Sequence, residues 1–284
     1  MKLFKDMTFG GERPLFGLQD ARLEGITITD GESGIKFCRN IEADGCKFIG
    51  KYPWWHVDGS LITNCYFAPG SRSAIWYSDN MVMKDCVIDA PKFFREMSGL
   101  TVENVVMNDA DETFWKVKGL KVRNLTLHDG TYPFMFCEDV DVDGLVSDSK
   151  YVFQYVKNVT VRNAKIVTKD SFWETENVTI YDSVLDGEYL GWHSKNLRLV
   201  RCHIAGEQPL CYTEDLVLED CTFDPACDRA FEDSSLHAEI KGSITNIKNP
   251  SNIYAFNRYT RNSTCLYHTQ VRQFLWRTEV KLRD

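Results

Sequence analysis

The sequence predicts an all-β fold, a single-domain, right-handed parallel β-helix in which the chain winds into stacked coils. The first observation is a repeat. One line of sequence recurs three times between Val159 and Leu216, as 159–177, 178–196 and 197–215. The second is that each copy opens with apolar residues at alternate positions, which is the period of a β-strand. The third is that a fixed period of about 20 residues without heptads is typical of a solenoid.

The repeat continues in both directions from these three copies. Its starts follow one another at an almost constant spacing, which predicts about ten to eleven coils between positions 21 and 250. The first coil lies around Leu23, and the later ones start at Ile41, Ser60, Met81, Leu100, Leu120, Val140, Val159, Val178, Leu197, Leu216 and Leu236.

Positions 1, 3, 6 and 8 of each coil are predicted to face the interior. Position 3 is apolar from Leu23 to Leu218, and position 8 is apolar from Ile28 to Phe223 except at Ser147. The change from odd to even interior positions requires a bend near position 5. From Gly25 to Asp220 that position holds Gly, Asn or Asp in every coil except one, where it is Arg201. These residue types tolerate the left-handed backbone angles of a corner.

The two ends of the chain depart from the repeat. Residues 1–20 contain turn residues and a proline, and we expect them to form an N-terminal cap over the first coil. Residues 251–284 are basic and lack the coil pattern, which predicts a C-terminal tail or cap. Within it, the segment from Val271 to Trp276 is weakly amphipathic.

Composition narrows the class of protein. The net charge of −8 disfavours nonspecific binding to nucleic acid or to an anionic membrane surface. No apolar run is long enough to span a membrane, and the segment 1–16 lacks the apolar core of a signal peptide, so we expect a cytoplasmic protein. Glycine-rich phosphate loops, nucleophile elbows and redox motifs are missing, which disfavours an NTPase, a common esterase or a dehydrogenase.

The ten cysteines are predicted to fill the interior. No C-x-x-C pair and no zinc-like Cys/His spacing occurs, so we expect no metal and no cofactor. Five cysteines share position 6 of their coils, where a small apolar side chain suits an interior stack. These are Cys46, Cys65, Cys86, Cys202 and Cys221.

Several motifs outside the repetitive strands resemble those of DUF3737, a bacterial family of unknown function. They are KYPWWH (51–56), AIWY (74–77), APKFFR (90–95), TKDSFWETENVTIYDS (168–183), GEYLGWHSKNLRL (187–199) and QPLCYTEDLVLEDC (208–221). The resemblance covers about residues 1–250 and implies a right-handed parallel β-helix with no assigned activity. The sequence departs from the family after residue 251, where a basic tail replaces the acidic, strand-like end that the resemblance implies.

The first candidate site is a column of polar residues that stand four positions before each coil. If these residues share a face, consecutive members lie about 5 Å apart. A carboxylate beside an imidazole raises the imidazole pKa, and a neighbouring tyrosine could relay a proton. The predicted catalytic residues are therefore Glu174, His193 and Tyr212.

Aromatic residues beside this column could provide flat surfaces for sugar rings, and a lysine could bind an anionic substituent. The predicted substrate-binding residues are His56, Tyr77, Trp115, Tyr155, Trp173, Trp192, Lys195 and Glu232. The alternative is that the tryptophans are interior and that the charged residues only pair between coils.

A second candidate site is position 9, which is rich in carboxylates. Clustered carboxylates could bind Ca²⁺ or serve as the acid and base of a glycosidase, although ordinary turn chemistry explains them equally well. The residues are Asp89, Asn108, His128, Asp148, Asp186 and Asp224, with Asp109, Asp111 and Glu112 beside them.

Three functions remain open at this point. The first is carbohydrate binding or processing on the aromatic and polar face, with a saccharide ligand and, if catalytic, lyase or hydrolase chemistry. The second is a non-catalytic scaffold that self-associates into a homo-oligomer. The third is an enzyme acting on a small intracellular metabolite, which would need a closed pocket.

Overall fold

The computed structural model describes residues 1–241, 244 and 246–257, and these residues contain strands and no helix. None of them belongs to a helix that could span a membrane. Contacts divide the chain into two compact units, Met1–Ser149 and a second that begins at Lys150. We call them unit 1 and unit 2 and describe each by itself.

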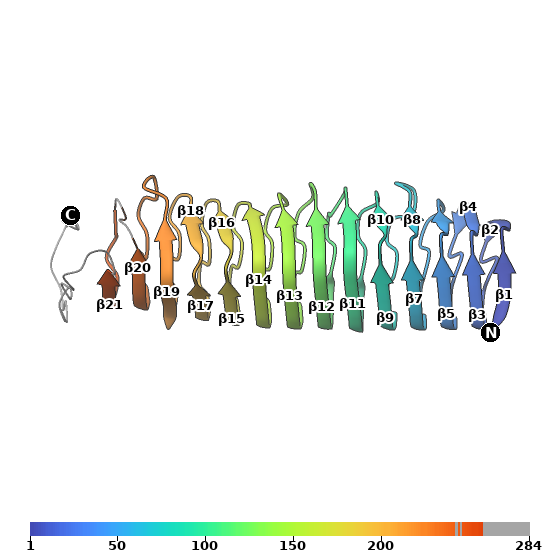
Figure 1. Ribbon diagram of the computed structural model, residues 1–284, viewed down its shortest axis with the longest axis horizontal. Coiled ribbons are helices and arrows are strands. Elements are labelled where there is room, and N and C mark those ends of the chain that lie inside the picture. Colours follow the sequence, from blue (N-terminus) through green and yellow to red (C-terminus); the bar gives the residue numbers. More distant parts are fainter. Residues whose placement is uncertain (242–243, 245, 258–284) are drawn as a thin grey trace. The chain divides into compact units, whose positions relative to one another are not determined.

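In unit 1 the longer strands stand side by side and run in the same direction (Figure 1). The strands of unit 1 are β1 (Lys2–Lys5), β2 (Thr8–Glu12), β3 (Gln19–Glu24), β4 (Thr27–Glu32), β5 (Arg39–Asp44), β6 (Lys47–Phe48), β7 (Asp58–Thr63), β8 (Tyr66–Phe67), β9 (Asp79–Lys84), β10 (Val87–Ile88), β11 (Arg95–Met107), β12 (Trp115–Leu127) and β13 (Glu138–Ser147).

Two parallel ladders build unit 1. One joins β1, β3, β5, β7 and β9, and the other joins β2, β4, β6, β8 and β10. Both ladders continue into β11, which is long enough to contribute to each of them, and then into β12 and β13. Each turn of the chain therefore places a copy of the same side chains beside the copy before it.

Unit 2 repeats this arrangement. Its strands are β14 (Lys157–Val167), β15 (Glu176–Tyr181), β16 (Val184–Asp186), β17 (Lys195–Val200), β18 (His203–Ala205), β19 (Leu216–Phe223), β20 (Ser235–Lys241) and β21 (Asn252–Asn257). One ladder runs β14–β15–β17–β19–β20–β21, and the other runs β14–β16–β18–β19, all in parallel pairs.

The predicted parallel solenoid is confirmed, but its turns are more numerous than predicted. The described residues form about 13 turns, against ten to eleven from the repeat. One reason is that β1 and β2 pair in register with β3 and β4, for example Phe4 with Leu23 and Phe9 with Ile28. The segment predicted as a cap over residues 1–20 therefore includes a turn of its own. Of the predicted tail, 251–257 continues the ladder as β21, while 258–284, including the segment from Val271 to Trp276, lies outside the described residues.

The interior follows the predicted positions. Every residue at position 3 from Leu23 to Leu218 is buried, and so is every residue at position 8 from Ile28 to Phe223. Between coils the interior aromatic rings stack face to face, as in Phe94, Phe114 and Phe134, whose centroids are 4.8 and 4.7 Å apart.

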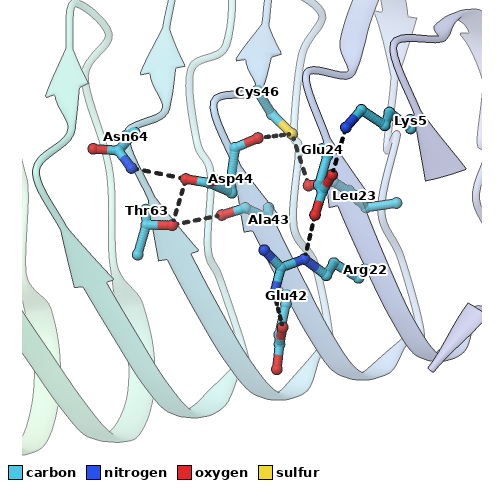
Figure 2. A network of polar contacts seen from close by, with 10 residues as sticks. All are labelled: Lys5, Arg22, Leu23, Glu24, Glu42, Ala43, Asp44, Cys46, Thr63 and Asn64. Carbon is cyan, nitrogen blue, oxygen red and sulfur yellow. Dashed lines mark hydrogen bonds and ion pairs between the residues drawn. The ribbon is translucent and has the colours of Figure 1, made fainter. Parts of the chain in front are cut away.

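The corner residues adopt the backbone angles that their types indicate. From Gly25 to Asp220, position 5 has a positive φ in every coil, including Arg201 at 53°. Side chains at these corners also bond from turn to turn, as in Asn124 to Asn104 at 3.0 Å. Figure 2 shows a related network, in which the Asp44 carboxylate accepts hydrogen bonds from Thr63 at 2.9 Å and Asn64 at 2.8 Å. These bonds hold the pKa of Asp44 below its usual value.

Candidate functional site

The predicted polar column exists as an aligned set within each unit. Its members have positive φ from Phe37 through Tyr212, and backbone N–H groups of the column donate to carbonyls of the next turn. In unit 2, for example, the Glu174 N–H donates to the Trp192 carbonyl at 2.8 Å. The residue just before each member forms a second column, which we call the tryptophan column. Up to Trp192 it consists of Lys36, Trp55, Trp76, Arg95, Trp115, Met135, Gln154, Trp173 and Trp192.

In unit 1 several aromatic rings of the two columns stack on their neighbours. His56 stacks between Phe37 and Tyr77, with centroids 4.8 and 5.1 Å apart. Trp55 and Trp76 stack at 5.3 Å with an interplanar angle of 17°. Because stacked rings expose mainly their edges, this ladder leaves little flat surface for a sugar ring.

Cations close the ends of the stacked tryptophans in unit 1. The Arg95 guanidinium lies 4.9 Å from the ring of Trp76 and 4.9 Å from that of Trp115. The Lys36 ammonium lies 5.4 Å from the Trp55 ring. The structure thus places His56 between two stacked rings, Tyr77 against the ring of His56, and Trp115 beside the Arg95 guanidinium.

Two N–H groups of the tryptophan column in unit 1 are also used. Trp55 Nε1 donates to the Ser73 carbonyl at 2.7 Å, and Trp76 Nε1 donates to the Lys92 carbonyl at 2.7 Å. In each case the acceptor belongs to the following turn, so the indole fastens one loop to the next.

In unit 2 this arrangement is interrupted at Trp173. Gln154 and Trp192 keep the loop-fastening bond, to the carbonyls of Asp170 at 3.1 Å and of Gln208 at 2.9 Å. The Trp173 Nε1 atom is buried and has no hydrogen-bond partner among the described residues. Buried polar groups without a partner are uncommon and each needs an explanation.

The rings around Trp173 are splayed instead of stacked. Trp173 and Trp192 lie 6.4 Å apart at 82°, although they are one turn apart like Trp55 and Trp76. Tyr189 and Tyr212 meet Trp192 at 65° and 84°, much as Tyr52 and Tyr77 meet Trp55 at 63° and 78° in unit 1, so the difference between the units lies in the tryptophan pair. Splayed, half-buried rings present parts of their faces to solvent, which a stacked ladder does not. We call Trp173, Tyr189, Trp192, His193 and Tyr212 the splayed aromatic cluster.

The predicted catalytic residues stand on three successive turns, as expected. However, among the described residues no ion pair or hydrogen bond joins the Glu174 carboxylate to the His193 ring. His193 instead stacks on Tyr212, with centroids 5.0 Å apart and planes at 14°. Stacking sets the Tyr212 ring face against the imidazole and directs its hydroxyl elsewhere, so the predicted proton relay gains no contact from this geometry.

The pKa of the Tyr212 hydroxyl is raised, for reasons other than contact with His193. Partial burial raises the pKa of Tyr212, and the negative charge of Glu232 raises it further. Glu232 itself is paired with Lys248 at 2.5 Å.

The remaining predicted residues of unit 2 have structural partners. Lys195, expected to bind an anionic substituent, pairs with Glu214 at 3.1 Å and lies opposite Glu176 in the ladder. Tyr155 is half-buried, and its backbone N–H donates to the Trp173 carbonyl at 2.9 Å.

One buried carboxyl group was not predicted from the sequence. Asp170 is 8% exposed as a residue, and its carboxylate oxygens are not among the buried side-chain atoms that lack a partner, so they keep contact with solvent. Burial raises the pKa of Asp170, the nearby Lys169 opposes this and Glu188 adds to it. The sequence shows Asp170 three positions before Trp173, but an aspartate at that place is explained equally well by an exposed turn.

The second candidate site consists largely of turn chemistry. Asp89 accepts hydrogen bonds from Tyr66 at 2.6 Å and from Asn108 at 2.7 Å. The Asp148 carboxylate lies 3.1 Å from the His128 ring, and Asp224 caps the N–H of Ala226 at 2.7 Å. Within the described ranges no group of three or more His, Cys, Asp or Glu side chains could hold a metal ion.

The fold and these columns define the chain as a parallel β-solenoid with aromatic and polar columns on the outside of its turns. The chain belongs to the family described as protein of unknown function DUF3737, whose model matches residues 2–260. The resemblance predicted from the loop motifs is thereby confirmed. No match was found among curated protein sequences.

Solved structures that are similar to this chain share its general architecture at low identity. The tailspike protein of E. coli bacteriophage HK620 in complex with a pentasaccharide is 11% identical with a TM-score of 0.49, and the match covers 85% of this chain and 62% of the tailspike chain. PfbA, a surface adhesin of Streptococcus pneumoniae, is 11% identical with a TM-score of 0.40, covering 92% and 85%. The A-module of the Azotobacter vinelandii mannuronan C-5 epimerase AlgE6 is 12% identical with a TM-score of 0.33, covering 87% and 81%. At these values the likeness carries no argument about function.

Proposed function

We propose that this protein binds carbohydrate at the splayed aromatic cluster of unit 2. The observation that carries the proposal is the break in the tryptophan column, where Trp173 and Trp192 lie at 82° and the Trp173 N–H lacks an acceptor among the described residues. In unit 1 the equivalent pair, Trp55 and Trp76, is stacked and both N–H groups are bonded.

A sugar ring matches what this break provides. Its C–H face packs on aromatic rings, while its hydroxyl groups accept and donate hydrogen bonds to a few polar groups, which is the usual composition of a small-molecule site. The cluster supplies half-buried ring faces at Trp173, Tyr189 and Trp192, with Glu174 and His193 exposed beside them.

A glycan array probed with the full chain, followed by isothermal titration of the glycans that bind, tests the proposal. Tyr189→Ala should weaken binding tenfold or more, because an aromatic anchor at the centre of a contact contributes about 2 kcal/mol. Tyr52→Ala is the matched control, since Tyr52 meets Trp55 at 5.6 Å and 63° in unit 1 much as Tyr189 meets Trp192. If no glycan binds, or if both variants weaken binding equally, the proposal is wrong.

Catalysis is a separate part of the prediction. If the bound glycan is also cleaved, Glu174→Gln and His193→Asn should each abolish product formation. Mass spectrometry of the incubated glycan measures this, and an unchanged glycan limits the function to binding.

Self-association is a second candidate, favoured by the first turn of unit 1. Leu3, Met7 and Phe16 expose 56, 44 and 53% of their surface there. Exposed apolar side chains gathered on one turn are typical of an interface. Light scattering at increasing concentration should then detect an oligomer that Leu3→Lys disrupts, and a monomer at all concentrations would exclude this candidate.

A further inference from the structure

Unit 1 contains a cavity that none of the sites described above includes. It lies at the carboxyl end of β4, and its volume is about 430 Å³, which is within the range of small-molecule sites. Its walls come from three successive turns and consist of three glycines, three charged residues and Ile49. The side chains of these residues therefore decide what the cavity can hold.

Glycines keep one wall of the cavity free of side chains. Gly31, Gly50 and Gly70 line it from three successive turns. A Cβ atom at Gly31 would lie 2.1 Å from the Gly11 carbonyl oxygen, and one at Gly70 would lie 2.5 Å from that of Ile49. Such distances are too short for a real side chain, so the close packing of the backbone requires glycine at these places. The wall therefore exposes only backbone.

The charged residues of the lining have both signs but do not pair with one another. Asp30 and Glu32 belong to β4, and Lys51 stands directly opposite Glu32 on the following turn. All three side chains are exposed, and among the described residues none of them makes an ion pair.

Elsewhere in unit 1 unlike charges that stand directly opposite one another do pair. Lys5 and Glu24 are opposite in the ladder, and their side chains lie 3.3 Å apart (Figure 2). Lys84 and Glu103 are also opposite and lie 2.7 Å apart. The charges around the cavity depart from this pattern, because they remain apart and are available to a ligand.

We propose that this cavity binds a basic amino acid, a small molecule with two cationic groups and one carboxylate. The cationic groups donate to the carboxylates of Asp30 and Glu32, and the Lys51 ammonium donates to the ligand carboxylate. Two negative charges and one positive charge of the lining thus meet the reverse set on the ligand, and each gains a partner. Ile49 is half-buried in the wall and contacts the aliphatic chain.

Other classes of small molecule match this lining less well. An acidic amino acid would set carboxylates against Asp30 and Glu32, and an uncharged saccharide would leave all three charges of the lining without a partner. The site is in unit 1 and does not depend on the carbohydrate binding proposed for unit 2.

The experiment titrates the isotope-labelled full chain with L-lysine and L-arginine and follows the backbone amide signals by NMR. We expect at least one of them to shift the signals of Gly31, Gly50 and Gly70 in a saturable way, with a Kd of about 1 mM because exposed ion pairs contribute little each. L-Glutamate and L-leucine should bind at least tenfold more weakly, and added salt should weaken the binding of the basic amino acid.

Matched variants assign each charge of the ligand to its partner. Lys51→Gln should weaken L-lysine about fivefold but leave cadaverine unaffected, because cadaverine has the two ammonium groups and no carboxylate. Glu32→Gln should weaken both ligands. Lys84→Gln is the control, since this lysine already pairs with Glu103 and lies outside the cavity, and it should leave the affinity unchanged. Circular dichroism checks folding, and Asp30→Asn replaces Glu32→Gln if that variant does not fold.

Three results would overturn the proposal. The first is no saturable shift with either basic amino acid up to about 10 mM, which is well above the expected Kd. The second is binding of L-glutamate or L-leucine as tight as that of L-lysine. The third is binding of L-lysine that Lys51→Gln weakens no more than Lys84→Gln does, since the ligand would then lie elsewhere. None of these results bears on carbohydrate binding in unit 2.

Discussion

The two tryptophans of unit 2 should respond in opposite ways to the same substitution. Trp192→Phe and Trp173→Phe each remove one indole N–H and the same side-chain volume from half-buried positions one turn apart. Only Trp192 Nε1 has an acceptor, the Gln208 carbonyl at 2.9 Å, whereas Trp173 Nε1 is buried without a partner among the described residues. The difference between the two variants therefore isolates what each N–H contributes.

The magnitude follows from the two local environments. Trp192→Phe loses one hydrogen bond, which costs about 1 kcal/mol, and the Gln208 carbonyl keeps only the weak bond from the Cys211 thiol at 3.4 Å. Trp173→Phe removes a donor whose desolvation is not repaid, which returns about 1 kcal/mol or more. The smaller ring costs both variants about the same, so Trp192→Phe should be less stable than Trp173→Phe by about 2 kcal/mol.

Urea unfolding followed by far-ultraviolet circular dichroism measures this difference. Trp55→Phe serves as a control in unit 1, where the N–H is bonded to Ser73 and the behaviour should match that of Trp192→Phe. Equal stability of the two unit 2 variants, or lower stability of Trp173→Phe, would show that the Trp173 N–H has a partner in solution and would refute the reasoning.

Three further predictions concern stability. Phe114→Ala removes a fully buried ring stacked at 4.8 and 4.7 Å on its neighbours, and should cost about 3–5 kcal/mol in urea unfolding. The raised pKa of Asp170 means that the folded state binds its proton more tightly, so this group stabilises the fold at low pH and loses that contribution as pH rises above about 4. Asp170→Asn should therefore be more stable than the wild type at pH 7 but not at pH 3. An equal gain in stability at both pH values would contradict this. Gly187→Ala should prevent folding of unit 2 as seen by circular dichroism, because its Cβ would lie 1.3 Å from the Thr168 carbonyl oxygen, whereas Gly45→Ala meets no atom within 4 Å and should cost only about 1–2 kcal/mol for its positive φ.

The sequence determined which side chains share a column, because the period and the alternation are both visible in it. Apolar residues at positions 3 and 8 lead directly to the buried rows that contain Leu23 and Ile28. Residue type at position 5 reports the backbone angle of the corner, since Asn, Asp and Gly accept positive φ most readily. The turn formed by β1 and β2 was not predicted because its side chains, such as Leu3, are largely exposed and follow no burial pattern.

The arrangement of rings within a column could not be read from the sequence. Trp55 and Trp76 are stacked while Trp173 and Trp192 are splayed, although each pair is separated by one turn of the same repeat. Side-chain direction depends on the loop that carries the ring and on which carbonyl it can reach, and these are tertiary properties. For the same reason Asp170 was indistinguishable from a turn residue until its burial was known.

The interior cysteines give each unit its own reporter of local opening. Cys137 in unit 1 and Cys211 in unit 2 are fully buried free thiols, and burial raises their pKa to about 12 and about 11. Alkylating reagents attack thiolates, so these side chains become reactive only when the surrounding turns separate and admit water. Pulsed alkylation followed by peptide mass analysis would therefore measure the opening of one unit independently of the other, without any engineered label.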